Sequence, residues 1–301
     1  MGLIDRALGN GIEVSAWTFD ELYGRDSKFL DALDKRMQAF VAEIPSDTHI
    51  WTVKPNVVRE TPTKTGKGQP KKIPRVASKP PACEVRNLVK YSSKFHEQSW
   101  QVYRIKDTER GPEVWEIKWL RVWRKTEDKF PSKQQTLIVA RNVRTGEIKF
   151  FLSNQVVGRG GVTLRWLLRV AFGRWAIEAC FRVSKEELGM DHFEVRGWRC
   201  IHRHYYVTAL SFLFTNRIRH SLDEDQSGGL TVEQVRRSVN AYLAHRNLPP
   251  PLRDEAFEKE LADQCYYQER SAQAKISHTK TRIKFYLELG IDVDKIKSCI
   301  T

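Results

Sequence analysis

A proline-rich basic segment divides this chain, because it can be neither helix nor interior strand. Residues 54–81 hold six of the twelve prolines, together with eight basic residues and one acidic residue. Proline removes a backbone donor and clashes with the preceding helical turn, so such a run stays extended. The sequence therefore predicts a folded region before residue 54, an extended basic segment, and further folded regions beyond it.

The first region reads as alternating helices and strands. Residues 2–9 have a helical apolar pattern, residues 12–19 are rich in β-formers, residues 26–40 repeat apolar positions at helical spacing, and residues 40–45 read as the next strand. Helix, strand, helix and strand within about 45 residues indicate an α/β fold with a parallel strand pair. Asp20 follows the first strand directly, at the end where open α/β sheets place ligands, although an Asp opening a turn is also ordinary turn chemistry.

The rest of the chain contains a β-rich region followed by helical regions. Four alternating or β-branched runs fall within residues 82–155 and predict an inserted antiparallel β unit, with Trp115, Ile117, Trp119 and Trp123 on its buried face rather than on a base-stacking platform. Helical patterns return over 162–188 and 202–220, and the tail is helical in patches broken by three prolines at 249–251. We expect domains at residues 1–53, 54–158, 159–222 and 223–301.

The charge distribution favours a polyanionic partner. The chain carries a net +14, with −4 over residues 1–53, +19 over residues 54–222 and −1 over residues 223–301. Basic residues that share segments with core-forming Trp, Phe and Val predict a folded surface for nucleic acid, and a generally basic protein is the alternative. Within residues 54–81 the expected phosphate contacts are Lys64, Lys67, Lys71, Lys72 and Arg75.

Other classes of protein are disfavoured. Charges interrupt every long apolar stretch within the roughly 20 residues that a membrane span needs, and the first residues do not resemble a signal peptide, so we expect a cytoplasmic protein. The five cysteines include no C-x-x-C pair, which predicts reduced thiols and no zinc site.

A stripe of charged residues marks the predicted helix 162–188. Arg174, Glu178, Arg182 and Lys185 recur at i, i+4, i+8 and i+11 on an otherwise apolar helix. Such a stripe is usually a solvated face, but a basic one also suits a DNA backbone. Together, Glu178 and Asp20 could hold a hard cation such as Mg²⁺, because close carboxylates repel one another strongly without one.

The segment from Arg174 to His204 closely resembles the C-terminal catalytic block of bacterial insertion-sequence transposases of the DDE class. Arg174-x3-Glu178-x6-Lys185 matches the spacing of the family's Y-x2-R-x3-E-x6-K motif, with Ala171 at the tyrosine position. The sequence WTFDELYG is similar to the block that holds the second catalytic aspartate, here Asp20, and residues 266–291 are similar to the family's C-terminal helices.

The resemblance implies a partial RNase H-like (integrase/transposase-type) core, with Asp20 and Glu178 as catalytic ligands of Mg²⁺ or Mn²⁺. Arg174, Lys185 and Arg182 would contact DNA. A complete enzyme of this kind would cleave transposon ends and join them to target DNA, in the bacterial cytoplasm and associated with the nucleoid. A copy of itself or an intact transposase would be its oligomeric partner.

The same resemblance places the family's first catalytic aspartate on a strand before the helix at residues 2–9, and Asp5 within that helix is no substitute. We therefore expect an N-terminally truncated transposase polypeptide that does not cleave DNA alone. The alternative is a non-enzymatic DNA-binding or interfering remnant.

Overall fold

The computed structural model describes residues 1–58, 74–77, 81–158, 160–223 and 230–299. Two units divide the chain. One consists of Met1–Arg174 with Thr279–Thr301, and the other of Trp175–His278.

The first unit begins with the predicted α/β alternation. Helix α1 (Gly2–Gly9), strand β1 (Trp17–Phe19), helices α2 (Glu21–Gly24) and α3 (Ser27–Lys35) and strand β2 (Phe40–Glu43) follow in order. β1 and β2 pair in parallel, with Trp17 opposite Phe40 and Phe19 opposite Ala42. The helix at residues 2–9 and the parallel strand pair are thus confirmed.

Two predicted boundaries in this region are wrong. The strand expected over residues 12–19 begins only at Trp17, and the helix expected over residues 26–40 ends at Lys35. Met37 adopts a left-handed conformation with φ 55°, and the backbone N–H of Gln38 donates to the carbonyl of Leu33. This is the hydrogen-bonded helix ending usually built with glycine, which the apolar spacing of the sequence does not reveal.

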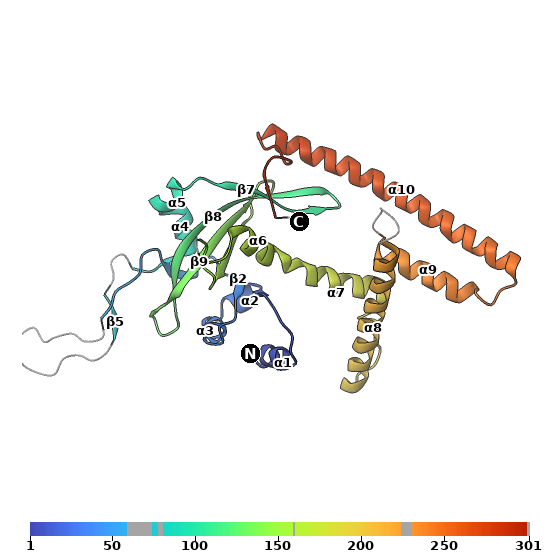
Figure 1. Ribbon diagram of the computed structural model, residues 1–301, viewed down its shortest axis with the longest axis horizontal. Helices are drawn as coiled ribbons and strands as arrows, with labels where there is room; N and C mark the ends of the chain where they lie inside the picture. The colour runs from blue at the N-terminus through green and yellow to red at the C-terminus, as the bar shows by residue number, and fades with distance from the viewer. Residues whose placement is uncertain (59–73, 78–80, 159, 224–229, 300–301) are drawn as a thin grey trace, which may run out of the picture. The chain divides into compact units, whose positions relative to one another are not determined.

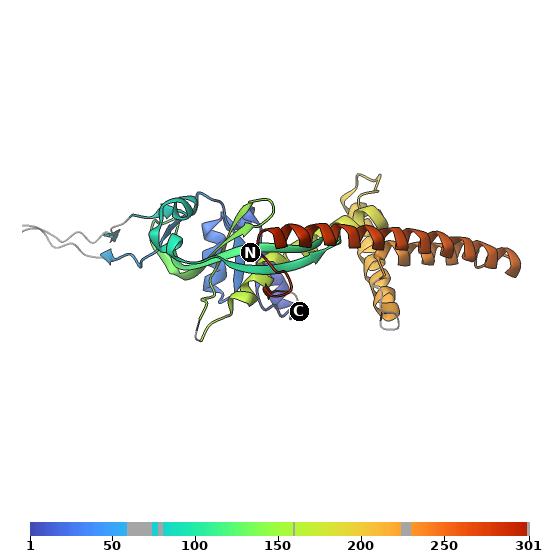
Figure 2. The same cartoon turned by 90° about the horizontal axis from the view of Figure 1, so that it is seen from above.

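The antiparallel strands continue the same sheet. β10 (Ile148–Ser153) pairs antiparallel with β2, so nine strands of the described chain form one sheet. Its main order is β1-β2-β10-β9-β8-β3-β6, with β9 (Pro131–Asn142), β8 (Gly111–Lys125), β3 (His49–Trp51) and β6 (Cys83–Glu84). β7 (Gln101–Thr108) pairs with β8 and with β11 (Lys297–Ser298), so the C-terminal residues return to the sheet, as Figure 2 shows. β4 (Val57–Val58) and β5 (Arg75–Val76) form a separate antiparallel pair, labelled at β5 in Figure 1.

Helices cover both faces of this sheet. Alternate residues of the central strands point to opposite sides, as the two-residue period of a strand requires. Phe40, Leu137 and Leu152 pack with α1, α3, α4 (Val85–Tyr91) and α5 (Ser93–Glu97). On the other face, Val41, Ile138 and Phe151 pack with helix α6 (Leu164–Gly173). The α/β class expected from the sequence is confirmed.

The helix predicted over 162–188 is two helices. Thr163 caps α6 by accepting a hydrogen bond from the Trp166 backbone, α6 ends at Gly173, and α7 begins at Trp175 and runs to Leu188. Glycine is a poor helix former, which accounts for an ending at this position. Arg174 therefore caps α6, whereas Glu178, Arg182 and Lys185 lie on α7.

The second unit is helical. It contains α7, α8 (Trp198–Asp223), α9 (Val232–His245) and the first part of α10 (Pro250–Glu288). Arg236 of α9 pairs with Glu187 of α7 at 3.1 Å, and Arg237 pairs with Glu260 of α10 at 3.0 Å. The prolines at 250 and 251 occupy the first turn of α10, where a missing N–H costs nothing. Over the described residues, no helix combines the length and apolarity needed to cross a bilayer.

The end of α10 belongs to the first unit. The Tyr286 side chain is buried beside Val114 of β8 and Val293, and its hydroxyl donates to the Pro112 carbonyl and accepts from the Val114 N–H, both at 3.3 Å. All five cysteines of the chain are free thiols.

Candidate active site at the carboxyl edge of the parallel strands

Asp20 lies where the sequence places it, at the carboxyl end of β1. Its carboxylate caps α2, accepting a hydrogen bond from the Tyr23 backbone at 3.3 Å. Across the described residues, no other hydrogen bond or ion pair occupies that carboxylate. Carboxylate oxygens are preferred ligands of Mg²⁺, so Asp20 retains the capacity to bind a hard cation.

A second carboxylate emerges beside it. Because Phe19 lies opposite Ala42 in a parallel pair, the next residues in register are Asp20 and Glu43. Glu43 accepts from Lys149 at 3.1 Å and faces Arg174 at 3.9 Å between carboxylate and guanidinium atoms. The Glu43 side chain is only 16% exposed, so these contacts are partly shielded from solvent.

Glu43 is not among the site residues expected from the sequence. The signal was present, because Glu43 ends the second strand of the parallel pair just as Asp20 follows the first. What the sequence does not contain is its long-range contact with Arg174, 131 positions later in the chain. Through Glu43, the structure brings the arginine of the transposase-like motif to the strand edge that carries Asp20.

Gly24 fixes α2 against this edge. A Cβ atom built on Gly24 would lie 1.8 Å from the backbone oxygen of Glu43 and 2.9 Å from its carbonyl carbon. Only a residue without a side chain lets α2 approach β2 so closely. Gly24 of the motif block therefore has a packing role, because it holds the helix that Asp20 caps.

The other motif residues lie on α7 in the second unit. Glu178 stands in the first turn of α7, where the helix dipole favours an acidic side chain. Arg182 pairs with Glu186 at 3.2 Å on an exposed face, which is the ordinary solvated arrangement, and Lys185 is exposed. Asp20 and Glu178 belong to different units, and their shared use of one metal ion stays a prediction.

The remaining predicted contacts are only partly described. Lys64, Lys67, Lys71 and Lys72 lie outside the residues that the structure describes, and Arg75 is an exposed residue of β5. Within the described ranges, no group of three or more His, Cys, Asp or Glu side chains forms a metal cluster. Asp5 lies on α1, as expected, and its hydrogen bond from Arg36 at 2.7 Å lowers the pKa of that carboxyl.

Comparison with known proteins adds one relationship. Residues 1–112 match the family described as DDE superfamily endonuclease. The matched region includes both strands of the parallel pair, Asp20 and Glu43. The match supports the similarity to DDE-class transposases, and no curated protein matches the chain.

Proposed function

We propose that this chain is a DDE-type transposase polypeptide for metal-dependent DNA strand cleavage and transfer. The observation that carries the proposal is the carboxyl edge of β1 and β2, where Asp20 caps α2 and Glu43 holds Arg174. This edge lies in the region that matches the endonuclease family, and its arginine belongs to the separate motif at residues 174–185.

The residues have distinct roles in this proposal. Asp20 and Glu178 bind Mg²⁺ or Mn²⁺, which supplies the activation of water or of a 3′ hydroxyl at a phosphate. Glu43 orients Arg174, and Arg174 and Lys185 hold the DNA backbone by charge-assisted contacts to its phosphates. Glu43 also moderates the positive charge of Arg174 until a phosphate competes for it.

DNA is the proposed substrate and main partner. The net charge of +19 over residues 54–222 supplies a non-specific attraction to phosphates, and Arg174 lies within that stretch. A second copy of the chain, or an intact transposase, is the proposed protein partner.

A second candidate function is DNA binding without cleavage. The basic charge of residues 54–158 favours it, since phosphate neutralisation needs no metal. A plasmid-nicking assay in Mn²⁺ separates the two candidates. It compares the wild-type protein with Glu178→Gln and with Glu186→Gln, a matched loss of one acid from the same helix.

The enzymatic proposal predicts nicking by the wild type and by Glu186→Gln, and its loss in Glu178→Gln, measured as conversion of supercoiled to open-circular plasmid. DNA binding by all three proteins with no nicking would favour the second candidate. Nicking by the wild type would also show that the expectation from the sequence, that this chain does not cleave DNA alone, is wrong.

A further inference from the structure

Lys149 is a third member of the charged group at the carboxyl edge. It lies on β10 two residues before Phe151, which is opposite Glu43 in the antiparallel pair of β10 with β2. Residues opposite one another, and residues two apart on one strand, share a face of the sheet, so Lys149 and Glu43 point to the same side. Together with Arg174 they belong to the first unit, so one folded unit holds all three side chains.

The carboxylate of Glu43 is divided between two cations. Its Oε1 atom accepts a hydrogen bond from the Lys149 ammonium at 3.1 Å, and its Oε2 atom lies 3.9 Å from the Arg174 guanidinium. The same ammonium group lies 3.7 Å from the Glu147 carboxylate. Because 3.1 Å is a hydrogen-bond distance and 3.9 Å is not, Lys149 holds Glu43 more firmly than Arg174 does.

Partial burial strengthens both interactions. The side chains of Lys149, Glu43 and Arg174 are 27%, 16% and 26% exposed. Charges shielded in this way attract one another more strongly than charges on an open surface, because water and salt screen them less. An arginine fully paired with such a glutamate must break that pair before it can bind a phosphate. The contact between Lys149 and Glu43 opposes full pairing.

A small cavity gives the Glu43 carboxylate room to move. It encloses about 250 Å³, and both Glu43 and Lys149 line it. A side chain packed on all sides cannot turn without displacing its neighbours, whereas a side chain at a cavity wall can. The carboxylate can therefore turn away from Arg174 and keep its ion pair with Lys149.

We propose that Lys149 is a positioning residue that keeps Arg174 available to a DNA phosphate. While Lys149 binds one oxygen of Glu43, Glu43 orients Arg174 without neutralising it. When a phosphate binds Arg174, the Glu43 carboxylate turns to Lys149 within the cavity. Without Lys149, both oxygens of Glu43 pair with the guanidinium and compete with the phosphate. This inference rests on the proposed function, because it takes Arg174 as a contact to the DNA backbone.

The test begins with DNA affinities from the anisotropy of a labelled duplex, measured in EDTA so that no divalent metal contributes. Lys149→Met keeps the apolar stem and removes the charge. It should weaken binding roughly tenfold, because Arg174 loses a charge-assisted contact to Glu43 competition. Lys149→Arg, which retains a cation, should bind like the wild type. Urea denaturation checks that each variant folds, and Lys149→Gln takes the place of Lys149→Met if that protein does not.

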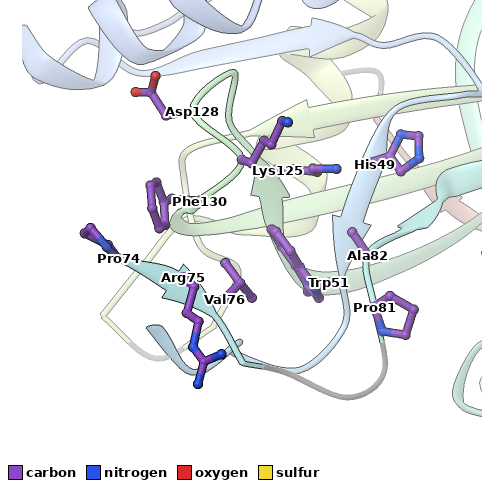
Figure 3. Close-up of a pocket in the computed structure, with 11 residues that line it drawn as sticks. His49, Trp51, Pro74, Arg75, Val76, Pro81, Ala82, Lys125, Asp128 and Phe130 are labelled. Atoms are coloured by element: carbon purple, nitrogen blue, oxygen red, sulfur yellow. The ribbon is translucent and has the colours of Figure 1, made fainter. Parts of the chain in front are cut away.

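A second substitution separates positioning from a structural role. Glu43→Gln removes the competing charge but keeps an amide oxygen toward Arg174, so it should restore the affinity of Lys149→Met to at least the wild-type value. Lys125→Met is the matched control, because Lys125 lines a separate cavity of the first unit with His49 and Trp51 (Figure 3). Combined with Glu43→Gln, each lysine variant returns to the wild-type net charge of +14.

The predicted result is a much larger gain from Glu43→Gln in Lys149→Met than in Lys125→Met or the wild type. Equal gains in all three proteins would show that only net charge matters and would overturn the inference. A folded Lys149→Met protein that stays weak after the second substitution, or one that binds DNA as tightly as the wild type, would also overturn it. Failure of the wild type to bind DNA would instead contradict the proposed function.

Discussion

DNA affinity is expected to fall about 10³-fold when monovalent salt rises from 50 to 200 mM. If the protein neutralises about six phosphates, the slope of log affinity against log salt is near −5, because each neutralised phosphate releases about 0.9 of a counterion. The charge of +19 over residues 54–222 is ample for contacts of that number. Fluorescence anisotropy with a labelled duplex at four salt concentrations measures the slope.

A matched pair of variants locates these contacts. Lys64→Gln with Lys67→Gln and Lys259→Gln with Lys275→Gln each lower the net charge from +14 by two. The first pair should reduce the slope to about −3, because two phosphate contacts are lost, and the second pair should leave it near −5. Affinity that does not change with salt, or equal effects of the two pairs, would contradict an interface in the basic segment.

Gly24→Ala should destabilise the first unit by about 2–3 kcal/mol. The new methyl group would meet the Glu43 backbone oxygen at 1.8 Å, so α2 must move away from β2. Overpacking that shifts backbone costs about 1–3 kcal/mol, and here the obstacle is backbone rather than a flexible side chain. Urea denaturation followed by circular dichroism measures the loss.

Gly9→Ala is the control for this substitution. Gly9 ends α1, and nothing lies within 4 Å of a Cβ atom built there. Because alanine is the better helix former, we expect no loss of stability.

Gly24→Ala should also weaken divalent-metal binding, since Asp20 caps the displaced helix. A Gly24→Ala protein as stable as the wild type would show that α2 does not depend on this close approach.

The local order of the first 45 residues could be predicted because it follows from periodicity alone. Helix 2–9 and the parallel strands carry clear apolar patterns, and their pairing follows from the short connection between them. The end of α3 could not be predicted, since it depends on Met37 accepting a left-handed backbone. The break between α6 and α7 depends on a single glycine within a strongly helical pattern.

Burial on β8 shows a second feature that the sequence pattern predicts only in part. Trp115 and Ile117 are buried as predicted, whereas Trp119 and Trp123 are only half-buried. Lys118 and Arg124, which alternate with the tryptophans, are only 4% and 2% exposed. Lys118 donates to the Phe95 carbonyl at 2.6 Å, and burial lowers the pKa of its ammonium group. Arg124 pairs with Asp31 of α3 and donates to Ser27. These partners are distant in sequence, so a strand pattern cannot identify them.

Contacts between residues that are distant in sequence also limit what could be predicted of the candidate site. Asp20 and Arg174 could be selected from the sequence because they stand in recognisable motif blocks. Glu43 had a sequence signal in its place at the end of the second parallel strand, but its contacts with Arg174 and Lys149 across the fold could not be predicted. The contribution of Glu178 rests on the motif spacing.

Calorimetric titration with Mn²⁺ tests most directly the proposal that Asp20 and Glu178 bind one divalent cation. Two carboxylates make a poor site, so we expect weak binding that Asp20→Asn and Glu178→Gln each abolish. Asparagine is as good a helix cap as aspartate, so Asp20→Asn removes the carboxylate charge without unfolding α2. The matched control is Asp26→Asn, at the N-terminal cap of α3. Mn²⁺ binding lost in both site variants and retained in Asp26→Asn is the predicted result. Tight binding that survives both site substitutions would contradict the claim.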